Sequence, residues 1–547
     1  MEKCNCNLNV ITRRSFLDRS LKTSTAIALG TLMDIPLVVK RALAEGSIGL
    51  NGKKLLFIWL RGANDGLNSV VPILDSAYAP NRPSLAIPAD PGTNYSTTGP
   101  ADFPTSGSAG SIYGDYPYGI RLGNGFAALH PSLKFLAPVY NAGDLALIHR
   151  VAYPRQSRSH FDSQRYWENG VPNNNLSNDG VFYRTMLEYL RDQGAAASAL
   201  SGVSIQSSLP LILRGSEAPM TNLTDPLRYD LLGVPNSTPG NAKASLFLNQ
   251  ANTYPFPEKQ SRNLLELQYQ NLSSTLSIFA QLDFTDAGNT YRDDEVTDAD
   301  QEWYDGNGNQ GYYLFPTTNV KNGGWRRPDG SSVFNKYAVP TNLQSLFERL
   351  KAAAIILNKT DAIIAGTEYG GFDTHSNQGQ LNGSHPDLNR GFGWAMYALR
   401  KYFMRYADRA TWDNVIVVTL TEFGRTTIEN ADEGTDHAEA GVMFAAGGAI
   451  RGYDGLGRSG VFNCSPSDPL VPWTTGQNGS MFGVNGRYLR RASDYRQVLG
   501  EIIRKHLGAT QNQLNRIIPG YADSAERLLA GGTSVDGTQI RPELGIL

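Results

Sequence analysis

Residues 415–448 read VIVVTLTEFGRTTIENADEGTDHAEAGVMFAAGG, in which two apolar runs enclose a polar segment. The runs 415–420 and 441–446 consist almost entirely of apolar residues and have the length of single strands. Continuous apolar runs of this length are typical of strands that are buried on both faces, as in a parallel sheet. The stretch therefore predicts two buried strands joined by a polar connection.

The connection between these strands carries several charged side chains. Glu422 and Arg425 follow the first strand closely, and Asp436 and His437 come shortly before the second. Ionised groups beside buried strands cost free energy unless another charge compensates them. We therefore expect these side chains to pair with one another or with a bound cation.

Similar patterns recur along the rest of the chain. Apolar runs that end in polar turns predict strands within residues 55–60, 145–151, 209–215 and 361–375. Apolar residues three and four positions apart predict helices at 261–282, 342–359, 387–407 and 492–508. Ser159 and Asp162 form a capping-box pattern that predicts another helix start. Strands that alternate with helices predict an α/β layered fold with a mainly parallel central sheet.

Composition excludes some classes of partner. The chain has 547 residues, a formal net charge of −2 and no long run of one sign. This balance does not indicate binding to nucleic acid or to an anionic membrane. We find no linker and no internal repeat, so we expect residues 45–547 to form one domain, with loop insertions at about 80–123 and 283–340.

The second insertion contains an acidic segment, DDEVTDADQEWYDGNGNQG, at residues 293–311. Its carboxylate and amide oxygens are the ligands that calcium prefers, but it lacks the spacing of an EF-hand loop. The segment is therefore either a calcium-binding loop or a plain solvated loop.

The N-terminus has the pattern of an export signal. Arg13 and Arg14 precede a mildly apolar stretch at 23–39, and residues 42–44 match a small-residue cleavage site. The apolar stretch is too short and too interrupted for a transmembrane helix, although an uncleaved amphipathic anchor would leave a similar pattern. We expect residues 1–44 to be a twin-arginine signal peptide and the mature protein to be periplasmic or extracellular, without a transmembrane span.

Polar clusters stand at the ends of the predicted strands. The ends of parallel strands meet at one edge of a sheet, where ligands bind in open α/β folds. The clusters are Asn64 with Asp65, residues 157–160, Asp373 to His375, Glu422 with Arg425, and Asp436 with His437. Several carboxylates and imidazoles gathered at one edge suit one or two divalent cations. We therefore expect a shared site for zinc, calcium, magnesium or manganese.

Two residues of these clusters suit an anionic substrate. Ser159 begins a helix, and the free N–H groups and the dipole of a helix N-terminus favour anions. Arg425 has a planar guanidinium that fits a tetrahedral oxyanion. The pattern therefore predicts a small anionic ester as the substrate.

Five segments of the chain together resemble a known family. They are LLFIWLRGANDGLNSVVP, RSHFDSQRYWENG, GGFDTHSNQ, LTEFGRTTIENADEGTDHAEAGVMFAAGGAIRGYDG and DYRQVLGEIIRKHLG. Over roughly residues 53–508 the chain is similar to domain-of-unknown-function family 1501, exported bacterial proteins placed in the alkaline phosphatase and sulfatase superfamily. The resemblance implies a three-layer alkaline-phosphatase-like fold and a metal-dependent hydrolase of phosphate or sulfate esters.

The superfamily pattern also implies the metal ligands and the nucleophile, and the chemistry of the clusters suggests the other roles. The residues that match metal ligands are Asp65, Asp373, His375, Glu422 and His437. The candidate catalytic residues are His160 and Ser159, which matches a nucleophile at a helix N-terminus better than Ser157 does. The candidates for substrate binding are Asn64 and Arg425. Asp436 is expected to contact the metal ligands without binding the metal itself.

The chain departs from the superfamily pattern in two places. Phe423 stands where a histidine is common, and Asp373 and His375 are closer together than the corresponding pair usually is. One metal, a harder cation or no metal therefore remain open. The chain is either an exported hydrolase or a degenerate, non-catalytic member that acts as an envelope binding or assembly protein. A metal-independent serine hydrolase is the third reading, and the G-x-S-x-G pattern that it would favour is not found around Ser159.

Each cluster also has a purely structural interpretation. Ser159 could only cap its helix, and Asp65 could form an Asx-turn. His160 could be a packed core histidine, and Glu422 and Arg425 could simply pair with each other. The positions of these side chains distinguish the two interpretations, because only the functional one requires them to surround one site.

Overall fold

The computed structural model describes most of the chain from residue 48 onward. The described residues are 48–49, 51–102, 116–193, 200–218, 220–227, 275, 278–286, 290–293, 312–316, 341–469, 471–475, 488–519, 521 and 543–547. The expected signal segment 1–44 lies outside them, as do most of the helix expected at 261–282 and of the acidic segment 293–311.

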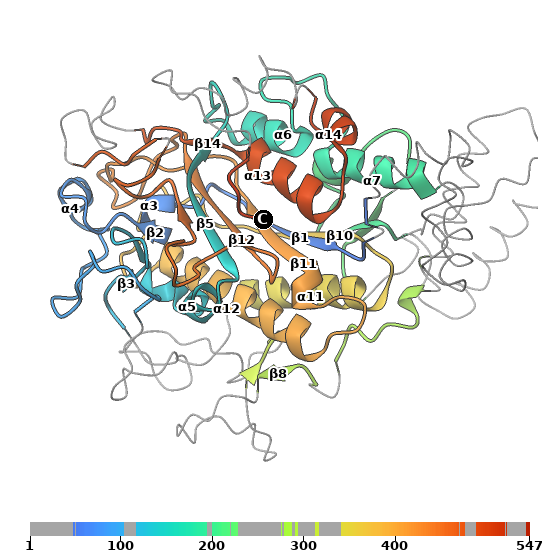
Figure 1. Ribbon diagram of the computed structural model, residues 1–547, viewed down its shortest axis with the longest axis horizontal. Helices are drawn as coiled ribbons and strands as arrows, with labels where there is room; N and C mark the ends of the chain where they lie inside the picture. The colour runs from blue at the N-terminus through green and yellow to red at the C-terminus, as the bar shows by residue number, and fades with distance from the viewer. Residues whose placement is uncertain are drawn as a thin grey trace, which may run out of the picture.

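A large central sheet organises these residues (Figure 1). Its strands, in spatial order, are β13 (Val461–Phe462), β5 (Leu145–Ala152), β12 (Gly441–Ala446), β11 (Val415–Leu420), β1 (Lys54–Leu60), β10 (Ile364–Tyr369), β6 (Gly202–Ile205) and β7 (Thr221–Leu223), with β14 (Ser493–Asp494) paired to β5. Every pairing is parallel except the two that β12 makes, with β11 and with β5. The predicted α/β fold with a mainly parallel central sheet is therefore confirmed.

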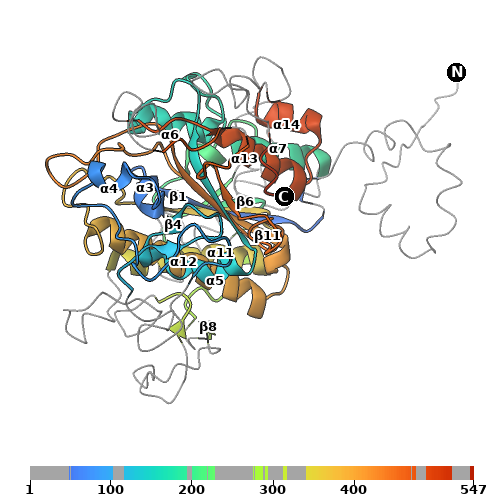
Figure 2. The same ribbon diagram turned by 60° about the vertical axis from the view of Figure 1, so that its left-hand side comes forward.

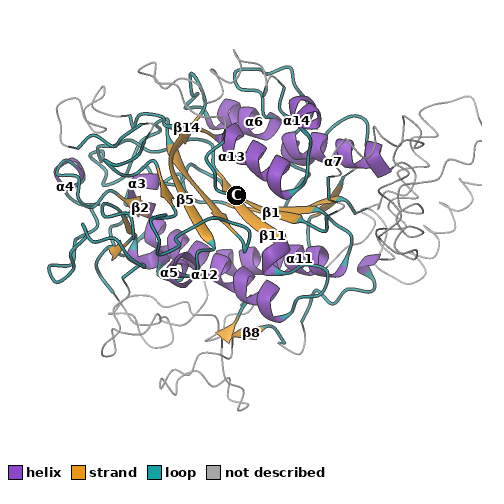
Figure 3. Cartoon of the chain, in the orientation of Figure 1, coloured by secondary structure: helices purple, strands orange, loops and turns teal. Residues whose placement is uncertain are grey.

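Helices cover both faces of this sheet (Figures 2 and 3). One face carries α5 (Leu136–Asn141), α11 (Thr341–Lys359) and α12 (Ser384–Arg405). The other face carries α6 (His160–Asn169), α7 (Val181–Gln193), α13 (Tyr495–Glu501) and α14 (Gln511–Ile517). None of the helices among the described residues is long and apolar enough to span a bilayer.

Shorter elements lie around these layers. Two small sheets are formed by β2 (Val70–Val71), β4 (Ala128–Leu129) and β3 (Ile120–Arg121), and by β8 (Arg292–Asp293) with β9 (Tyr312–Tyr313). The short helices are α3 (Gly66–Ser69) and α4 (Tyr78–Asn81), the single turns η1 (Pro131–Leu133), η3 (Leu211–Leu213) and η5 (Trp412–Asn414), and the π-helical η6 (Ile502–His506).

The core follows from the two-residue period of β1. All seven of its residues are buried. Leu56 and Ile58 belong to the apolar core that includes α11 and α12, whereas Leu55 and Phe57 belong to the core that includes α7, α13 and α14. Successive side chains of a strand point to opposite faces, so a strand between two helical layers is apolar on both faces along most of its length.

The prediction of a strand at residues 209–215 is wrong. The structure has a single 3-10 turn, η3, at this position, and all three of its residues are buried. Pro210 precedes the turn with φ −69° and has no N–H to donate to a sheet, which disfavours a central strand. The strands at this end of the sheet, β6 and the edge strand β7, have only four and three residues, too few for a clear apolar pattern.

The close packing of β1 against β10 gives a test of this core. Gly366 in β10 pairs with Phe57 in β1, and a Cβ atom at Gly366 would lie 2.3 Å from the Phe57 ring. We expect Gly366→Ala to lower the free energy of unfolding by roughly 1–3 kcal/mol, because the ring has to move within a packed core. Gly370→Ala is the matched control, since its new Cβ would have no neighbour closer than Arg61 Cβ at 3.9 Å. Equal denaturation midpoints for the two variants would contradict the packing described.

Candidate metal centre

Five segments that are distant in sequence meet at one edge of the sheet. β10 and β11 flank β1 and run parallel to it, so the loops after these three strands begin at the same edge. β12 runs antiparallel to β11, and the segment that precedes β12 therefore reaches this edge as well. β5 is antiparallel to β12 and also ends here, shortly before α6 begins. The predicted clusters thus come from neighbouring loops.

Four side chains from these loops form a group that we call the imidazole cluster: His160, Asp373, His375 and His437. Nε2 of His437 lies 3.0 Å from Nε2 of His160 and 2.9 Å from Nε2 of His375. Oδ1 of Asp373 lies 3.2 Å from Nε2 of His437 and 3.1 Å from Nε2 of His375. Its Oδ2 lies 3.5 Å from Nε2 of His160. All three imidazoles therefore turn the same nitrogen toward one carboxylate.

The other nitrogen of each imidazole, Nδ1, faces an acceptor of its own. The pairs are His437 with the Arg158 carbonyl at 2.9 Å, His375 with the Asp436 carboxylate at 3.3 Å, and His160 with the Glu422 carboxylate at 3.9 Å. The last distance exceeds a hydrogen bond, so that pair interacts electrostatically. A carbonyl or carboxylate oxygen only accepts, so it favours the proton on Nδ1 and leaves a lone pair on Nε2. We infer the tautomers from these partners.

Converging lone pairs make the cluster suitable for a cation. Two Nε2 atoms about 3 Å apart can share a hydrogen bond only if one of them is protonated, which charges that ring when Nδ1 keeps its proton. Imidazoles whose outer N–H is held by a carboxylate or a carbonyl are the usual form of histidine metal ligands. Ligand atoms of His160, Asp373 and His437 lie within 4.8 Å of one another. Imidazole nitrogens with one carboxylate suit zinc and similar transition metals better than calcium or magnesium.

The charge state of the cluster fits this chemistry. Burial opposes ionisation of Asp373, but the Arg425 guanidinium holds the pKa of its carboxyl at about 2. Burial, assisted by Arg425, lowers the pKa of His437, which favours the neutral ring that a metal ligand needs. The Glu422 carboxylate raises the pKa of His160 against the effect of burial. A cation would therefore compete with a proton at His160 more than at His437.

Arg425 is fully buried and holds the loops of this edge together. Its acceptors are the carbonyl oxygens of Gly62, Ala63, Phe372 and Thr435 and the carboxylate of Asp373. These partners belong to the loop after β1, the loop after β10 and the segment before β12. The guanidinium is committed to them, so the arrangement gives no support to its expected contact with a substrate.

Glu422 lies behind the imidazole cluster instead of within it. Its carboxylate accepts hydrogen bonds from the N–H groups of Gly62 at 3.1 Å and Ala63 at 3.0 Å, and its exposed fraction is 2%. Burial opposes its ionisation, yet the His160 imidazole and the Gly62 N–H lower its pKa. Glu422 thus acts on His160 through its charge, whereas Asp436 lies within hydrogen-bond distance of His375.

Asp65 and Asn64 belong to a separate buried network. The Asp65 carboxylate forms an ion pair with Arg82 at 2.5 Å and accepts hydrogen bonds from Gln378 at 2.7 Å and from the Leu67 N–H at 3.2 Å. Both of its oxygens are therefore occupied, as expected for a structural cap of α3. Asn64 Oδ1 lies within hydrogen-bond distance of Ser69 Oγ and of His385 Nε2. The structure does not bring these two side chains to the cluster.

Ser159 caps α6 and stands next to the cluster in sequence. Its Oγ accepts a hydrogen bond from the Asp162 N–H at 3.4 Å, as the capping-box pattern predicts. Its own N–H donates to Ser157 Oγ at 3.2 Å. Ser159 is partly exposed, so the hydroxyl that caps the helix is also open to a nucleophilic role.

Phe423 forms an apolar wall of the cluster. Its ring centre lies 4.8 Å from that of His160 and 4.7 Å from that of His437. The histidine that the superfamily pattern expects at this position is absent, but His160 brings an imidazole to the same place from α6. We expected His160 as a catalytic residue, and its geometry is that of a ligand. The sequence predicted that His160 lies at the start of a helix after β5. It did not predict that the imidazole points toward Asp373 and His437.

Comparison with known proteins gives one match. Residues 52–465 match a family model described as "Protein of unknown function (DUF1501)". The matched range contains every residue of the imidazole cluster. No curated protein and no solved structure matches the chain significantly.

The cluster geometry predicts metal binding that depends on His437. We expect protein prepared with zinc to contain one equivalent, and His437→Ala to weaken zinc affinity by at least about 100-fold, because it removes the central ligand. Elemental analysis and competition with a zinc-binding dye measure both quantities. Asp432→Asn is the control, since Asp432 is an exposed acid of the same connection between β11 and β12. Wild-type affinity in His437→Ala would rule out the cluster as the zinc site.

Asp65 should behave differently from the cluster residues. Asp65→Asn leaves the Arg82 guanidinium buried without its counter-charge, and we expect it to lower the free energy of unfolding by about 3 kcal/mol. Zinc content should stay at the wild-type level, because Asp65 is committed to Arg82 and Gln378. Denaturant unfolding combined with elemental analysis distinguishes the two roles. Loss of zinc without loss of stability would show instead that Asp65 is a ligand.

Proposed function

This chain belongs to the DUF1501 family, and from that premise we propose that it is an exported hydrolase with a divalent metal ion in the imidazole cluster. We propose phosphate or sulfate esters as its substrates and an alkaline-phosphatase-like arrangement of its α/β fold. One observation carries the proposal: three Nε2 atoms converge on the Asp373 carboxylate, and each ring has an acceptor behind it. Without a cation, the lone pairs on the three Nε2 atoms would repel one another, so a purely structural role does not explain this arrangement.

The residues of the cluster would hold the ion in distinct ways. His160, His375 and His437 would each offer Nε2, and Asp373 would offer a carboxylate oxygen that Arg425 keeps ionised. A divalent ion, when bound, neutralises an anionic ester and polarises its oxygens. The donor set favours zinc over calcium, magnesium and manganese among the cations that the sequence leaves open.

Ser159 is the proposed nucleophile, and Arg158 the proposed anion-binding residue. Ser159 immediately precedes the ligand His160, and its Oγ lies at the positive end of α6. Arg158 is exposed, and its guanidinium lies over the Tyr488 ring at 4.6 Å. Its carbonyl is fixed by His437, which keeps the residue beside the cluster. We assign to Arg158 the contact with substrate that the sequence suggested for Arg425.

The alternative of a non-catalytic envelope protein has less support. It depended on the missing histidine at Phe423 and on the two insertions. Phe423 packs against two imidazoles of an intact cluster, and most of the second insertion lies outside the described residues. Export by the twin-arginine route stays a prediction, because residues 1–44 lie outside the described residues.

Three substitutions separate the nucleophilic role of Ser159 from its role as a cap. Asparagine caps helices as well as serine does but has no hydroxyl, whereas threonine keeps both properties. We expect Ser159→Asn to retain the wild-type melting temperature and to lose turnover of p-nitrophenyl phosphate or sulfate on the order of a thousandfold. Ser159→Thr should keep part of the activity, and Ser159→Ala should lose both activity and about 1 kcal/mol of stability.

The zinc-loaded wild-type protein and a chelator-treated sample are the references for these assays. Full activity in Ser159→Asn would leave that residue only its capping role. A wild-type protein that binds zinc but hydrolyses neither ester would remove the hydrolase proposal and favour the envelope-binding alternative.

A further inference from the structure

A pocket of about 490 Å³ lies beside the imidazole cluster and has no role in the mechanism above. Its lining residues come from the ends of β1 and β10, from one side of α6 and from residues 206–214. Its polar lining residues include Arg61, Gln164, Glu168, Gln206, Ser207, Ser208 and Glu368. Two of its residues adjoin the metal centre directly in sequence, because Arg61 precedes Gly62 and Phe161 follows His160.

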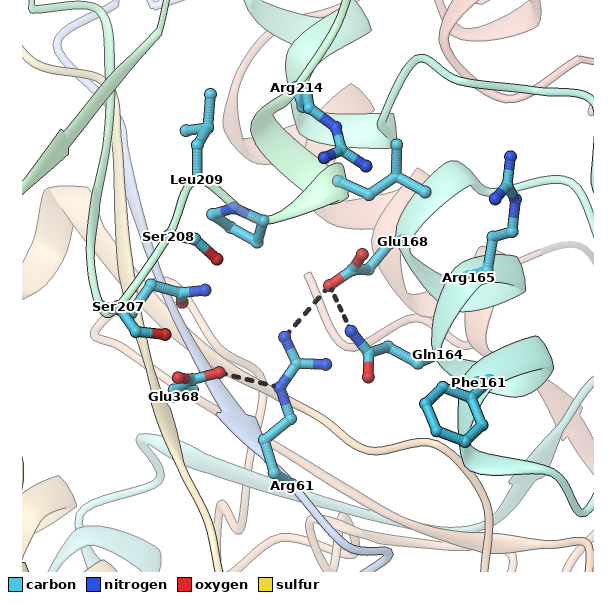
Figure 4. Close-up of a pocket in the computed structure, with 13 residues that line it drawn as sticks. Arg61, Phe161, Gln164, Arg165, Glu168, Ser207, Ser208, Leu209, Arg214 and Glu368 are labelled. Carbon is cyan, nitrogen blue, oxygen red and sulfur yellow. Dashed lines mark hydrogen bonds and ion pairs between the residues drawn. The ribbon is translucent and has the colours of Figure 1, made fainter. Parts of the chain in front are cut away.

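Arg61 is fixed in the middle of this pocket (Figure 4). Its Nε donates to Glu368 at 3.1 Å and its Nη2 donates to Glu168 at 3.2 Å. Its guanidinium also lies over the Trp59 ring at 4.3 Å. Gln164 Nε2 reaches the same Glu168 oxygen at 3.5 Å. Two carboxylates and one cation thus hold each other in place before any ligand arrives.

Several polar atoms of the lining residues have no partner among the described residues. They are the donors Arg61 Nη1 and Arg165 Nε and the acceptor Gln206 Oε1, all of them buried. Buried donors and acceptors without partners cost free energy, and a ligand or ordered water that satisfies them recovers it. A ligand that reaches these atoms has to both donate and accept hydrogen bonds.

The chemistry of the lining selects one class of ligand. The lining carries three guanidinium groups, those of Arg61, Arg165 and Arg214, and two carboxylates, those of Glu168 and Glu368, both paired with Arg61. An anion would leave Gln206 Oε1 unsatisfied, and a cation would meet the guanidinium groups. An apolar ligand would satisfy none of the unpartnered atoms. Hydroxyl groups donate and accept at the same atom, and a ring that carries several of them matches this mixed lining.

A second feature supports the same class. The Phe161 side chain lines the pocket with an exposed fraction of 89%. An exposed aromatic ring beside polar side chains offers a flat surface on which an amphipathic ring can stack. We propose that this pocket binds a neutral sugar ring, by hydrogen bonds to Arg61, Gln206 and Glu368 and by stacking on Phe161.

This assignment concerns binding and needs no metal. In combination with the proposed function, on which this last step alone rests, it makes the substrate a phosphate or sulfate ester of a carbohydrate. The sugar would occupy the pocket while the ester group reaches the imidazole cluster across the start of α6.

Saturation-transfer NMR tests the proposal with a panel of glucose, galactose, mannose, cellobiose and lactose. We expect at least one of these sugars to bind the full-length protein saturably, both before and after chelator treatment. Phe161→Ala and Gln206→Leu should each weaken that binding by about tenfold. Gln206→Leu should not lower the melting temperature, because Gln206 Oε1 has no partner to lose. Leu456→Ala is the control, since Leu456 is equally exposed at 92% and does not line the pocket.

The outcomes separate this proposal from the metal-dependent one. Sugar binding that survives chelation but fails in the two pocket variants supports the pocket even if no ester is hydrolysed. Failure of all five sugars to bind, or equal binding in both variants and wild type, would overturn it. Loss of binding on chelation alone, or competition by sodium sulfate at the same site, would also overturn it, since the ligand would then be recognised by the metal or by its charge.

Discussion

The candidate site depends on one buried guanidinium. The Arg425 guanidinium is buried and cannot be solvated by water. Four backbone carbonyls and the Asp373 carboxylate compensate its charge instead. Those partners belong to three loops that would otherwise be independent of one another. A buried cation is stable only when such a set of acceptors is complete. The same contacts that satisfy Arg425 therefore fix the position and the ionisation of Asp373.

The rest of the centre is arranged around that carboxylate. Three imidazoles reach it from α6, from the loop after β10 and from the segment before β12, and each is held from behind by an oxygen acceptor. In all three histidines Nε2 faces the Asp373 carboxylate, and Nδ1 faces an oxygen acceptor of the surrounding loops. Neighbouring polar groups are excluded from this point because they have other partners, as Asp65 has in Arg82.

Much of the fold and the location of the site could be predicted from the sequence, whereas the role of each residue could not. Apolar runs identified β1, β5, β10, β11 and β12, because a strand covered on both faces is mostly apolar. Asp436 and His437 reach the same edge as the other clusters because β12 is antiparallel, which no local pattern specifies. A carboxylate at a strand end also looks the same in sequence whether it turns toward a cation, as Asp373 does, or toward a buried arginine, as Asp65 does. His160 and Glu422 depart from their expected places for this reason, because His160 turns Nε2 into the cluster and Glu422 lies behind it. The polar pocket around Arg61 gave no linear signal at all.

The central claim is that one cation is shared by side chains from these separate loops. Anomalous diffraction from crystals of the protein, recorded on both sides of the zinc absorption edge, locates such an ion without reference to activity. The account predicts a single strong peak about 2.1 Å from the Nε2 atoms of His160, His375 and His437, with the Asp373 carboxylate at a similar distance. A fully ordered cluster without a peak, in crystals grown with zinc, or a peak bound by other residues, would contradict it.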